Sequence, residues 1–189
     1  MAFTVDVPAY VIEASIDCCN AVDIGNRGDG SDGTYDQQLV GIIGQNMVNV
    51  AIGKPLVTPS KGHDGGIDFE LFGITFDVKT IGRNVAPRIE YVNNLVKAQT
   101  KYSVDAYLFL SLNKLSNRIT VCGWLPKMEF LDRATLYRKG LQRVRDDGSL
   151  FVLKSDNYEI RNDQLFYRAK CWPDLFVEFY NYSSIEVAA

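Results

Sequence analysis

The stretch Gly66-Ile67-Asp68-Phe69-Glu70-Leu71-Phe72-Gly73-Ile74-Thr75-Phe76-Asp77-Val78-Lys79-Thr80 is the most informative part of this 189-residue chain. It predicts two short apolar strands joined by Phe72-Gly73, because glycine tolerates the positive φ that a two-residue hairpin turn needs. That turn pairs Leu71 with Ile74 and Phe69 with Phe76, which places Asp68 opposite Asp77. Side chains alternate between the two faces of a strand, so Asp77 and Lys79 point the same way. We therefore expect two carboxylates and an ammonium to converge, an arrangement that suits a hard divalent cation beside a phosphate.

Asp68, followed by Asp77-Val78-Lys79, resembles the core motif of the PD-(D/E)XK nuclease superfamily, which has the restriction-endonuclease-like fold. Ile67 stands where the first half of that motif has proline. The resemblance covers roughly residues 34–124. It implies an α/β fold with a restriction-endonuclease-like core, in which helices flank a central mixed β-sheet.

The resemblance also implies a metal-dependent deoxyribonuclease, an endonuclease rather than an exonuclease. Asp68 and Asp77 would bind Mg²⁺, with the Val78 carbonyl as a third ligand and Mn²⁺ as a substitute. Mg²⁺ prefers oxygen ligands and keeps several waters, so two carboxylates and a substrate phosphate suffice to bind it. Lys79 would position or activate the attacking water. Hydrolysis would leave a 5′-phosphate and a 3′-hydroxyl.

Many members of the superfamily supply a further glutamate from the helix before the hairpin. The matching stretch here is Val40-Gly41-Ile42-Ile43-Gly44-Gln45-Asn46, which places Gln45 at the glutamate position. An amide oxygen can still ligate a metal or orient a water, but it carries no charge. We therefore count Gln45 among the catalytic candidates and expect weaker binding of a second ion, or a one-metal mechanism.

Candidate substrate contacts surround this motif. A helix predicted over residues 88–102 carries Gln99, Lys97 and Lys101, which can contact phosphates. RecB-like nucleases of the superfamily have a Gln-x-x-x-Tyr helix here, and this chain has the shorter Gln99-Thr100-Lys101-Tyr102. His63 would lie at the mouth of the site, and Thr80 directly follows Lys79. Ordinary solvated positions are the alternative for these side chains.

Three functions stay open at this level. The first is the nuclease. The second is a catalytically weakened or inactive member of the fold that binds nucleic acid or a protein partner, which Gln45 and the acidic net charge of −3 favour. The third is a structural protein with the fold alone, in which Asp68 and Asp77 are exposed and Lys79 forms a surface ion pair worth about 0–1 kcal/mol.

Hydrophobic periodicity predicts the remaining elements. Helices are expected over residues 8–22, 35–52 and 88–102, at the start of the segment 126–145, and within 173–180. Strands are expected at 56–58, 106–112 and 150–154, and 118–124 is expected to pair with 106–112. Residues 81–87 are expected to form a loop. No repeat or linker divides the chain, so we expect residues 1–189 to form a single domain.

Composition bounds the class of protein. The apolar fraction of 47% is ordinary for a globular protein, and no apolar run is long enough to span a bilayer. The N-terminus lacks the features of a secretory signal, and the four cysteines have no ligand-like spacing, so we expect buried free thiols and a cytoplasmic location. A small nuclease without a recognition domain suits a phage, which would place it in the host cytoplasm. Many relatives form dimers, so a homodimer is a further expectation.

Charge is distributed unevenly along the chain. Residues 1–36 hold seven acidic residues and one basic residue, whereas residues 114–145 hold eight basic residues and two acidic ones. Such a basic segment can contact phosphates while the net charge stays acidic. A solvated surface explains it equally well.

Overall fold

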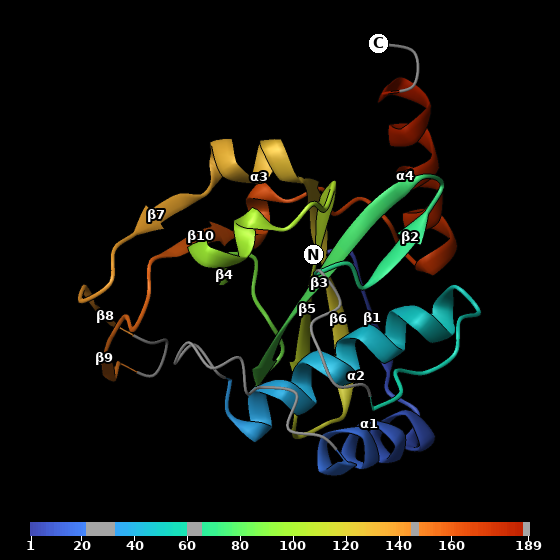
Figure 1. The fold of residues 1–189 in the computed structure, drawn as a ribbon, viewed down its shortest axis with the longest axis horizontal. Coiled ribbons are helices and arrows are strands. Elements are labelled where there is room, and N and C mark those ends of the chain that lie inside the picture. Colours follow the sequence, from blue (N-terminus) through green and yellow to red (C-terminus); the bar gives the residue numbers. More distant parts are fainter. Residues whose placement is uncertain (22–32, 60–65, 145–147, 187–189) are drawn as a thin grey trace.

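The computed structural model describes residues 1–21, 33–59, 66–144 and 148–186, without the side chains of residues 185 and 186 (Figure 1). A five-stranded sheet with the order β1-β6-β5-β3-β2 forms its centre. Its strands are β1 (Phe3–Asp6), β2 (Phe69–Leu71), β3 (Ile74–Arg83), β5 (Ala106–Asn113) and β6 (Arg118–Pro126). β3 and β5 are parallel, and the other neighbouring pairs are antiparallel. The predicted α/β class with a mixed central sheet is therefore confirmed.

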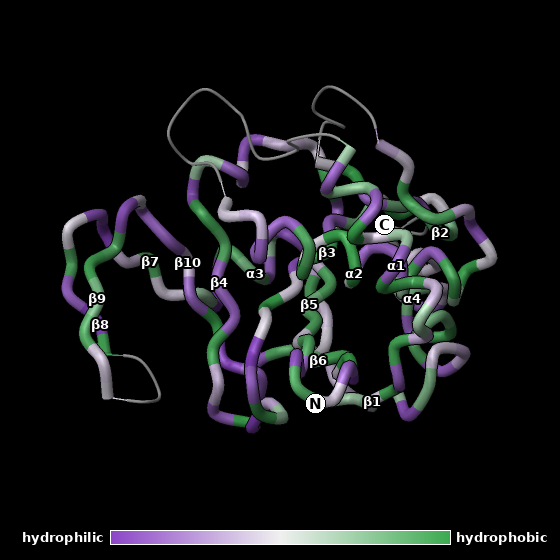
Figure 2. The backbone as a smooth tube through the Cα atoms, turned by 90° about the horizontal axis from the view of Figure 1, so that it is seen from below, coloured by the Kyte–Doolittle hydropathy of each residue, from purple (hydrophilic) through white to green (hydrophobic). Residues whose placement is uncertain are grey.

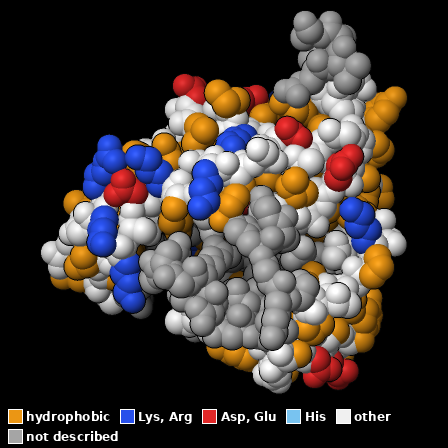
Figure 3. Space-filling model, viewed as in Figure 1, with side chains coloured by type: hydrophobic (Ala, Val, Ile, Leu, Met, Phe, Trp, Pro, Cys, Tyr) orange, Lys and Arg blue, Asp and Glu red, His pale blue; other side chains and the backbone are white. Residues whose placement is uncertain are grey.

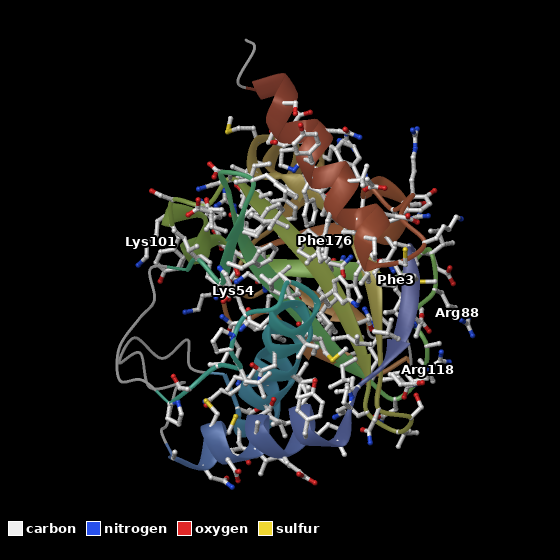
Figure 4. The ribbon with its side chains drawn as sticks, turned by 90° about the vertical axis from the view of Figure 1, so that its right-hand side faces the viewer. Phe3, Lys54, Arg88, Lys101, Arg118 and Phe176 are labelled. Atoms are coloured by element: carbon white, nitrogen blue, oxygen red, sulfur yellow. The ribbon has the colours of Figure 1, made fainter. Side chains whose placement is uncertain are left out.

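Helices cover one face of this sheet. They are α1 (Ala9–Ala21), α2 (Tyr35–Ala51) and α4 (Trp172–Glu186). Figure 4 shows α2 and α4 in front of the sheet, with Phe176 of α4 on the side of Phe3 in β1. Val11, Ile43 and Phe179, one from each helix, are buried in the same apolar core as Leu108 of β5.

A second, smaller sheet covers the opposite face. It has the order β4-β10-β7, formed by β4 (Val92–Val96), β10 (Asn157–Arg161) and β7 (Thr135–Tyr137). Together with α3 (Lys127–Arg133), it encloses a second core that includes Tyr107, Phe109, Phe130 and Ile160. The prediction of flanking helices therefore holds for one face, while strands and α3 share the other.

A hairpin of β8 (Gln142–Val144) and β9 (Leu150–Val152) forms a separate two-stranded sheet. Figure 2 shows it at the end of the molecule, beyond β7 and β10 and away from α4. Among the described residues, no helix is long and apolar enough to cross a membrane.

The predicted start of α2 at Tyr35 is confirmed, and a capping box lies at this end of the helix. The Thr34 hydroxyl accepts a hydrogen bond from the Gln37 amide at 3.3 Å, and the Gln37 side chain accepts one from the Thr34 amide at 2.9 Å. This reciprocal arrangement is a capping box, which satisfies two amides at the helix start.

The predicted helix over residues 88–102 is wrong. The segment forms β4 and a short 3₁₀ helix, η1 (Lys97–Lys101). β4 pairs with β10, with Leu95 opposite Tyr158, so a partner more than 60 residues away in the sequence outweighs the local periodicity. The Asn93 amide also donates to Asn162 at 2.8 Å, which satisfies a buried polar group on the strand.

Two smaller predictions also fail. Residues 56–58 form no strand, because the Val57 amide donates to the Asn46 side chain at 2.7 Å instead of to a neighbouring strand. The predicted loop at 81–87 begins late, since β3 continues to Arg83 and pairs with β5 as far as Asn113.

Candidate active site

The β2–β3 hairpin has the predicted turn and register. Phe72 and Gly73 both have positive φ angles, 55° and 76°, as a type I′ hairpin turn requires. Phe69 lies opposite Phe76, and the amide of Asp68 donates to the Phe76 carbonyl at 2.9 Å. The pairing therefore extends one residue beyond β2 and brings Asp68 beside the centre of β3.

The Asp68 carboxylate continues the pairing where β2 has ended. Its Oδ2 accepts a hydrogen bond from the Val78 amide at 2.6 Å. A side-chain oxygen thus takes the place that a backbone carbonyl of the neighbouring strand would otherwise fill. This bond fixes the carboxylate at the edge of β3, next to the residue that follows Asp77.

Asp77 and Lys79 form a close ion pair on one face of β3. The Lys79 ammonium is 2.8 Å from Asp77 Oδ1, and the side chains are 21% and 4% exposed, respectively. Their neighbours Phe76 and Val78 point to the opposite face, into the core beneath the helices. Asp77 is therefore a buried carboxylate, whereas Lys79 still reaches solvent.

The chain also places a tyrosine beside this pair. Tyr107 of β5 lies directly opposite Asp77 in the parallel register and packs against Phe109 and Phe130. Burial raises the pKa of the Tyr107 hydroxyl above its usual range, and the negative charge of Asp77 raises it further. The hydroxyl has no hydrogen-bond partner among the described residues.

The donor set fits a hard divalent cation. Asp68 and Asp77 supply carboxylate oxygens from adjacent strands, and the Val78 carbonyl lies between Asp77 and Lys79 in sequence. The described part of the chain contains no group of three or more histidine, cysteine, aspartate or glutamate side chains that could hold a metal. Two carboxylates suit Mg²⁺, which completes its coordination with water and substrate oxygens.

Gln45 and Thr80 lie on the α2 side of β3. A Cβ on Gly44, the residue before Gln45, would be 1.8 Å from Thr80 Oγ1, so the backbone of α2 approaches β3 closely here. Gln45 itself is half-buried. Because Thr80 points toward α2, the structure does not bring its hydroxyl to the face that carries Lys79.

The other candidate substrate residues belong to η1. Lys97 and Lys101 are exposed and Gln99 is half-buried. The ring of Tyr102, which follows η1, lies against Gly66, where a Cβ would be 2.8 Å from ring atoms. The Lys101 ammonium is 5.3 Å from the centre of that ring. The end of η1 is thereby held at the segment leading into Asp68.

A cavity of about 480 Å³ lies beside η1 and the residues that precede β10. It is lined by Val96, Lys97, Ala98, Thr100, Lys101, Ser155 and Asp156. Its lining has two lysines and the Asp156 carboxylate, which is 3.9 Å from the Lys97 ammonium, and the Thr100 hydroxyl donates to the Lys97 carbonyl. His63 lies outside the described residues.

Three of the four cysteines are the buried free thiols that the sequence predicts. They are Cys18, Cys19 and Cys122, whereas Cys171 is exposed. Burial is the main cause of the raised pKa of all three buried thiols and brings that of Cys122 to about 12. These thiols therefore stay protonated near neutral pH.

Two residues near the site were not anticipated from the sequence. Tyr107 is found only through the parallel register of β3 with β5, which no local pattern encodes. Lys127 at the start of α3 donates to the Tyr102 carbonyl at 2.6 Å and fixes the end of η1. Its position in the basic segment 114–145 was the only signal.

Comparisons with protein-family models, curated proteins and solved structures found no match for this chain.

Proposed function

We propose that this chain is a metal-dependent nuclease that hydrolyses phosphodiester bonds in DNA. The observation that carries the proposal is the buried Asp77 carboxylate, whose Oδ1 is 2.8 Å from the Lys79 ammonium. The Asp68 carboxylate lies beside it on the neighbouring segment, where its Oδ2 accepts from the Val78 amide at 2.6 Å. The resemblance of these residues to the PD-(D/E)XK motif supports the same assignment.

Each residue has a distinct role in this proposal. Asp68, Asp77 and the Val78 carbonyl would hold Mg²⁺, or Mn²⁺ in its place. Bound there, the ion would polarise the phosphate and promote formation of the hydroxide nucleophile. Lys79 would donate to the phosphate oxygen on which negative charge develops, because its ammonium is fixed by Asp77 yet reaches solvent. The products would carry 5′-phosphate and 3′-hydroxyl ends.

A restriction-endonuclease-like core belongs to the same proposal. α2, the β2–β3 hairpin and the parallel strand β5 support it, since they follow the order expected for that core. The connection from β3 to β5 departs from it, because β4 and η1 replace the expected helix.

A second candidate is a nucleic-acid-binding protein with weakened or lost cleavage. This second candidate is supported by Gln45 on α2, which is uncharged and stands where many members of the PD-(D/E)XK superfamily have a glutamate. In that case the site would bind one metal ion weakly, and the basic residues would account for the function.

The test is cleavage of labelled linear, nicked, single-stranded and branched DNA with Mg²⁺ or Mn²⁺. Asp77→Asn and Lys79→Ala should each lower the rate by about 100-fold or more, because the first removes an anionic ligand of the metal and the second removes the cation beside the reacting phosphate. Glu70→Gln is the matched control, since Glu70 is an exposed carboxylate on the same hairpin. Its rate should equal that of the wild type.

Other outcomes separate the two candidates. If Gln45→Glu is the only variant that cleaves DNA, the wild-type chain has lost the catalytic activity of its fold and acts by binding nucleic acid. Cleavage that survives both Asp77→Asn and Lys79→Ala contradicts the hairpin as the active site. The absence of cleavage in every variant, Gln45→Glu included, contradicts the nuclease proposal.

A further inference from the structure

The β8–β9 hairpin extends the β7–β10 pair into an arm. The Gly140 amide donates to the Leu153 carbonyl at 2.9 Å, and the Leu153 amide donates to the Leu141 carbonyl at 3.0 Å. We refer to β8, β9 and their bases at residues 138–141 and 153–154 as the arm. Since β8 and β9 pair only with each other in a two-stranded sheet, the arm projects from the molecule (Figure 2).

The two faces of the arm differ in chemistry. Val144 lies opposite Leu150, and Gln142 lies opposite Val152, all on the outer face. The apolar members are largely solvent-exposed, at 66% for Val144, 60% for Leu150 and 56% for Val152. Arg143, which belongs to the inner face, is half-buried.

The inner face anchors the arm to the second sheet. The Arg143 guanidinium lies 3.9 Å from the centre of the Tyr137 ring and donates to Glu159 at 2.6 Å. With this anchor in place, the three outer aliphatic side chains contribute little to the core. Contiguous apolar side chains on a projecting hairpin are typical of a binding surface.

Basic side chains flank the outer face. Arg138 and Lys139 lie at one base of the arm and Lys154 at the other, and all three are exposed. Figure 3 shows lysine and arginine side chains gathered at this end of the molecule, with hydrophobic side chains among them. Asp156, two residues beyond the arm, accepts hydrogen bonds from the Arg138 side chain and the Lys139 amide. It offsets the charge of Arg138, which leaves the ammonium groups of Lys139 and Lys154 as the cations of this surface among the described residues. The charge of this surface is complementary to a polyanion.

The arm is also continuous with the candidate active site. The Lys97 amide of η1 donates to the Asp156 carbonyl at 2.8 Å, and Lys97 and Lys101 both line the 480 Å³ cavity beside it. The end of η1 in turn contacts the segment leading to Asp68 through Tyr102. Basic residues therefore lie along a path from the arm through η1 to the hairpin.

We propose that the arm binds a groove of double-stranded DNA. The outer face of Val144, Leu150 and Val152 would contact base edges and sugars, while Lys139 and Lys154 would contact phosphates on either side. A duplex is favoured because its major groove admits a two-stranded β-ribbon, and thymine methyl groups there accept apolar contacts. The choice of DNA rests on the proposed function, whereas the surface itself is observed.

The test measures binding of the wild-type chain to a duplex of about 20 bp in EDTA, where a metal-dependent nuclease cannot cut. Val144→Thr/Leu150→Thr/Val152→Thr should weaken binding by about 10-fold with an unchanged salt dependence, because the lost contacts are apolar. Lys139→Gln/Lys154→Gln should lower the slope of log affinity against log salt by about two. Single-stranded DNA of the same length should bind more weakly than the duplex.

Matched controls are exposed residues elsewhere. Leu115→Thr/Met128→Thr removes aliphatic side chains that are 78% and 75% exposed, and Arg88→Gln/Arg118→Gln removes two exposed cations. Both controls should bind like the wild type. If the triple arm variant unfolds, Val152→Thr alone and the lysine variant replace it, because their side chains contact no core.

Three results would overturn the inference. The first is a wild-type chain that does not bind the duplex. The second is duplex binding that neither arm variant changes. The third is a loss of dimer mass in the triple variant with unchanged DNA binding, which would make the outer face an interface between two copies. Arm-dependent binding without any Mg²⁺-dependent cleavage would instead refute the nuclease proposal and leave this inference standing.

Discussion

Asp77 is a buried carboxylate in the middle of β3, paired with one cation. Its side chain is 4% exposed, and the Lys79 ammonium is 2.8 Å from Oδ1. Burying such a pair costs desolvation free energy that its attraction often fails to repay, so well-packed apolar residues would commonly give equal or better stability. Stability alone therefore does not explain why β3 carries this pair in place of apolar residues.

Tyr107 gives a prediction about a buried polar group. Its hydroxyl has no hydrogen-bond partner among the described residues, and Tyr107 is fully buried. Burying a hydroxyl away from water is unfavourable when it forms no hydrogen bond, and Tyr107→Phe removes this hydroxyl. The free energy of unfolding, measured in urea at neutral pH without divalent cations, should stay equal or rise by about 1 kcal/mol.

Thr75→Val is the control for that measurement, because it removes a hydroxyl that does form hydrogen bonds. The Thr75 hydroxyl donates to Asp105 at 2.6 Å and accepts from the Asp105 amide at 3.1 Å. Its loss should lower the free energy of unfolding by about 1 kcal/mol. A destabilisation of Tyr107→Phe as large as that of Thr75→Val would mean that the Tyr107 hydroxyl forms a bond in solution.

Residues of the site differ in how far the sequence predicts them. Asp68 and Asp77 are set by a two-residue turn and the period of a strand, so their pairing follows from local rules. Tyr107 reaches Asp77 only because β3 and β5 are parallel with one particular register. The direction of Thr80, opposite to that of Lys79, also follows from the period of the strand, whereas its contact with α2 depends on packing that the sequence alone does not define.

At the level of elements, the contact between α2 and β3 depends on a glycine. At Gly44, a Cβ would be 1.8 Å from Thr80 Oγ1 and 2.9 Å from Thr80 Cβ, whereas at Gly41 nothing lies within 4 Å. Gly44→Ala should therefore destabilise the fold by about 1–3 kcal/mol through overpacking. Gly41→Ala, on the same helix, should stabilise it by about 0.5–1 kcal/mol through helix propensity.

Urea unfolding followed by circular dichroism distinguishes the two glycines. Because both substitutions add one methyl group to α2, the difference between them isolates the contact with β3. Equal stability of the two variants would mean that α2 does not approach Thr80 as closely as described.

Asp156 at the base of the arm gives a pH-dependent prediction. The Lys139 amide and then the Arg138 side chain, both hydrogen-bonded to its carboxylate, lower the pKa of Asp156. A lowered folded-state pKa stabilises the fold above the unfolded pKa of about 3.9, and this stabilisation is lost as the pH falls through the folded pKa. Asp156→Asn should therefore be less stable than the wild type at pH 7, with a smaller difference near pH 3.

The control for this prediction is Asp132→Asn, which removes an exposed carboxylate on α3. It should leave stability nearly unchanged at both values of pH. A stability difference for Asp156→Asn that is the same at pH 7 and pH 3 would assign the effect to packing instead of to charge.

Elements were predicted correctly where one local signal dominated. The Phe72-Gly73 turn is encoded in two residues, and the helical period of residues 35–52 is enough to predict α2. β4 was mistaken for a helix because Val92, Leu95 and Val96 fit a helical period as well as a strand. Its partner β10 decides between the two, and that partner is distant in the sequence.

At the scale of the whole molecule, the acidic and basic segments of the sequence contribute to different faces of the structure. The acidic residues 1–36 contribute β1, α1 and the start of α2, and both helices lie on the helical face of the sheet; three of the seven acidic residues lie outside the described part of the chain. The basic segment contributes β6, α3, β7 and β8, of which α3 and β7 lie on the opposite face, toward which Asp77 and Lys79 point. A nucleic acid approaching the site from that face would meet the basic side of the molecule, although the net charge is −3.

Binding of Mg²⁺ should stabilise the whole fold, whether or not the chain cuts DNA. A ligand that binds only the folded state at about ten times its Kd adds about 1.4 kcal/mol of stability. For a chain of this size that raises the Tm by about 3–6 °C. Thermal unfolding with MgCl₂, against NaCl of equal ionic strength, should show this rise for the wild type and for Glu70→Gln but not for Asp77→Asn. A rise of equal size in Asp77→Asn would place the bound cation elsewhere, and its absence in the wild type would remove the metal from the proposed site.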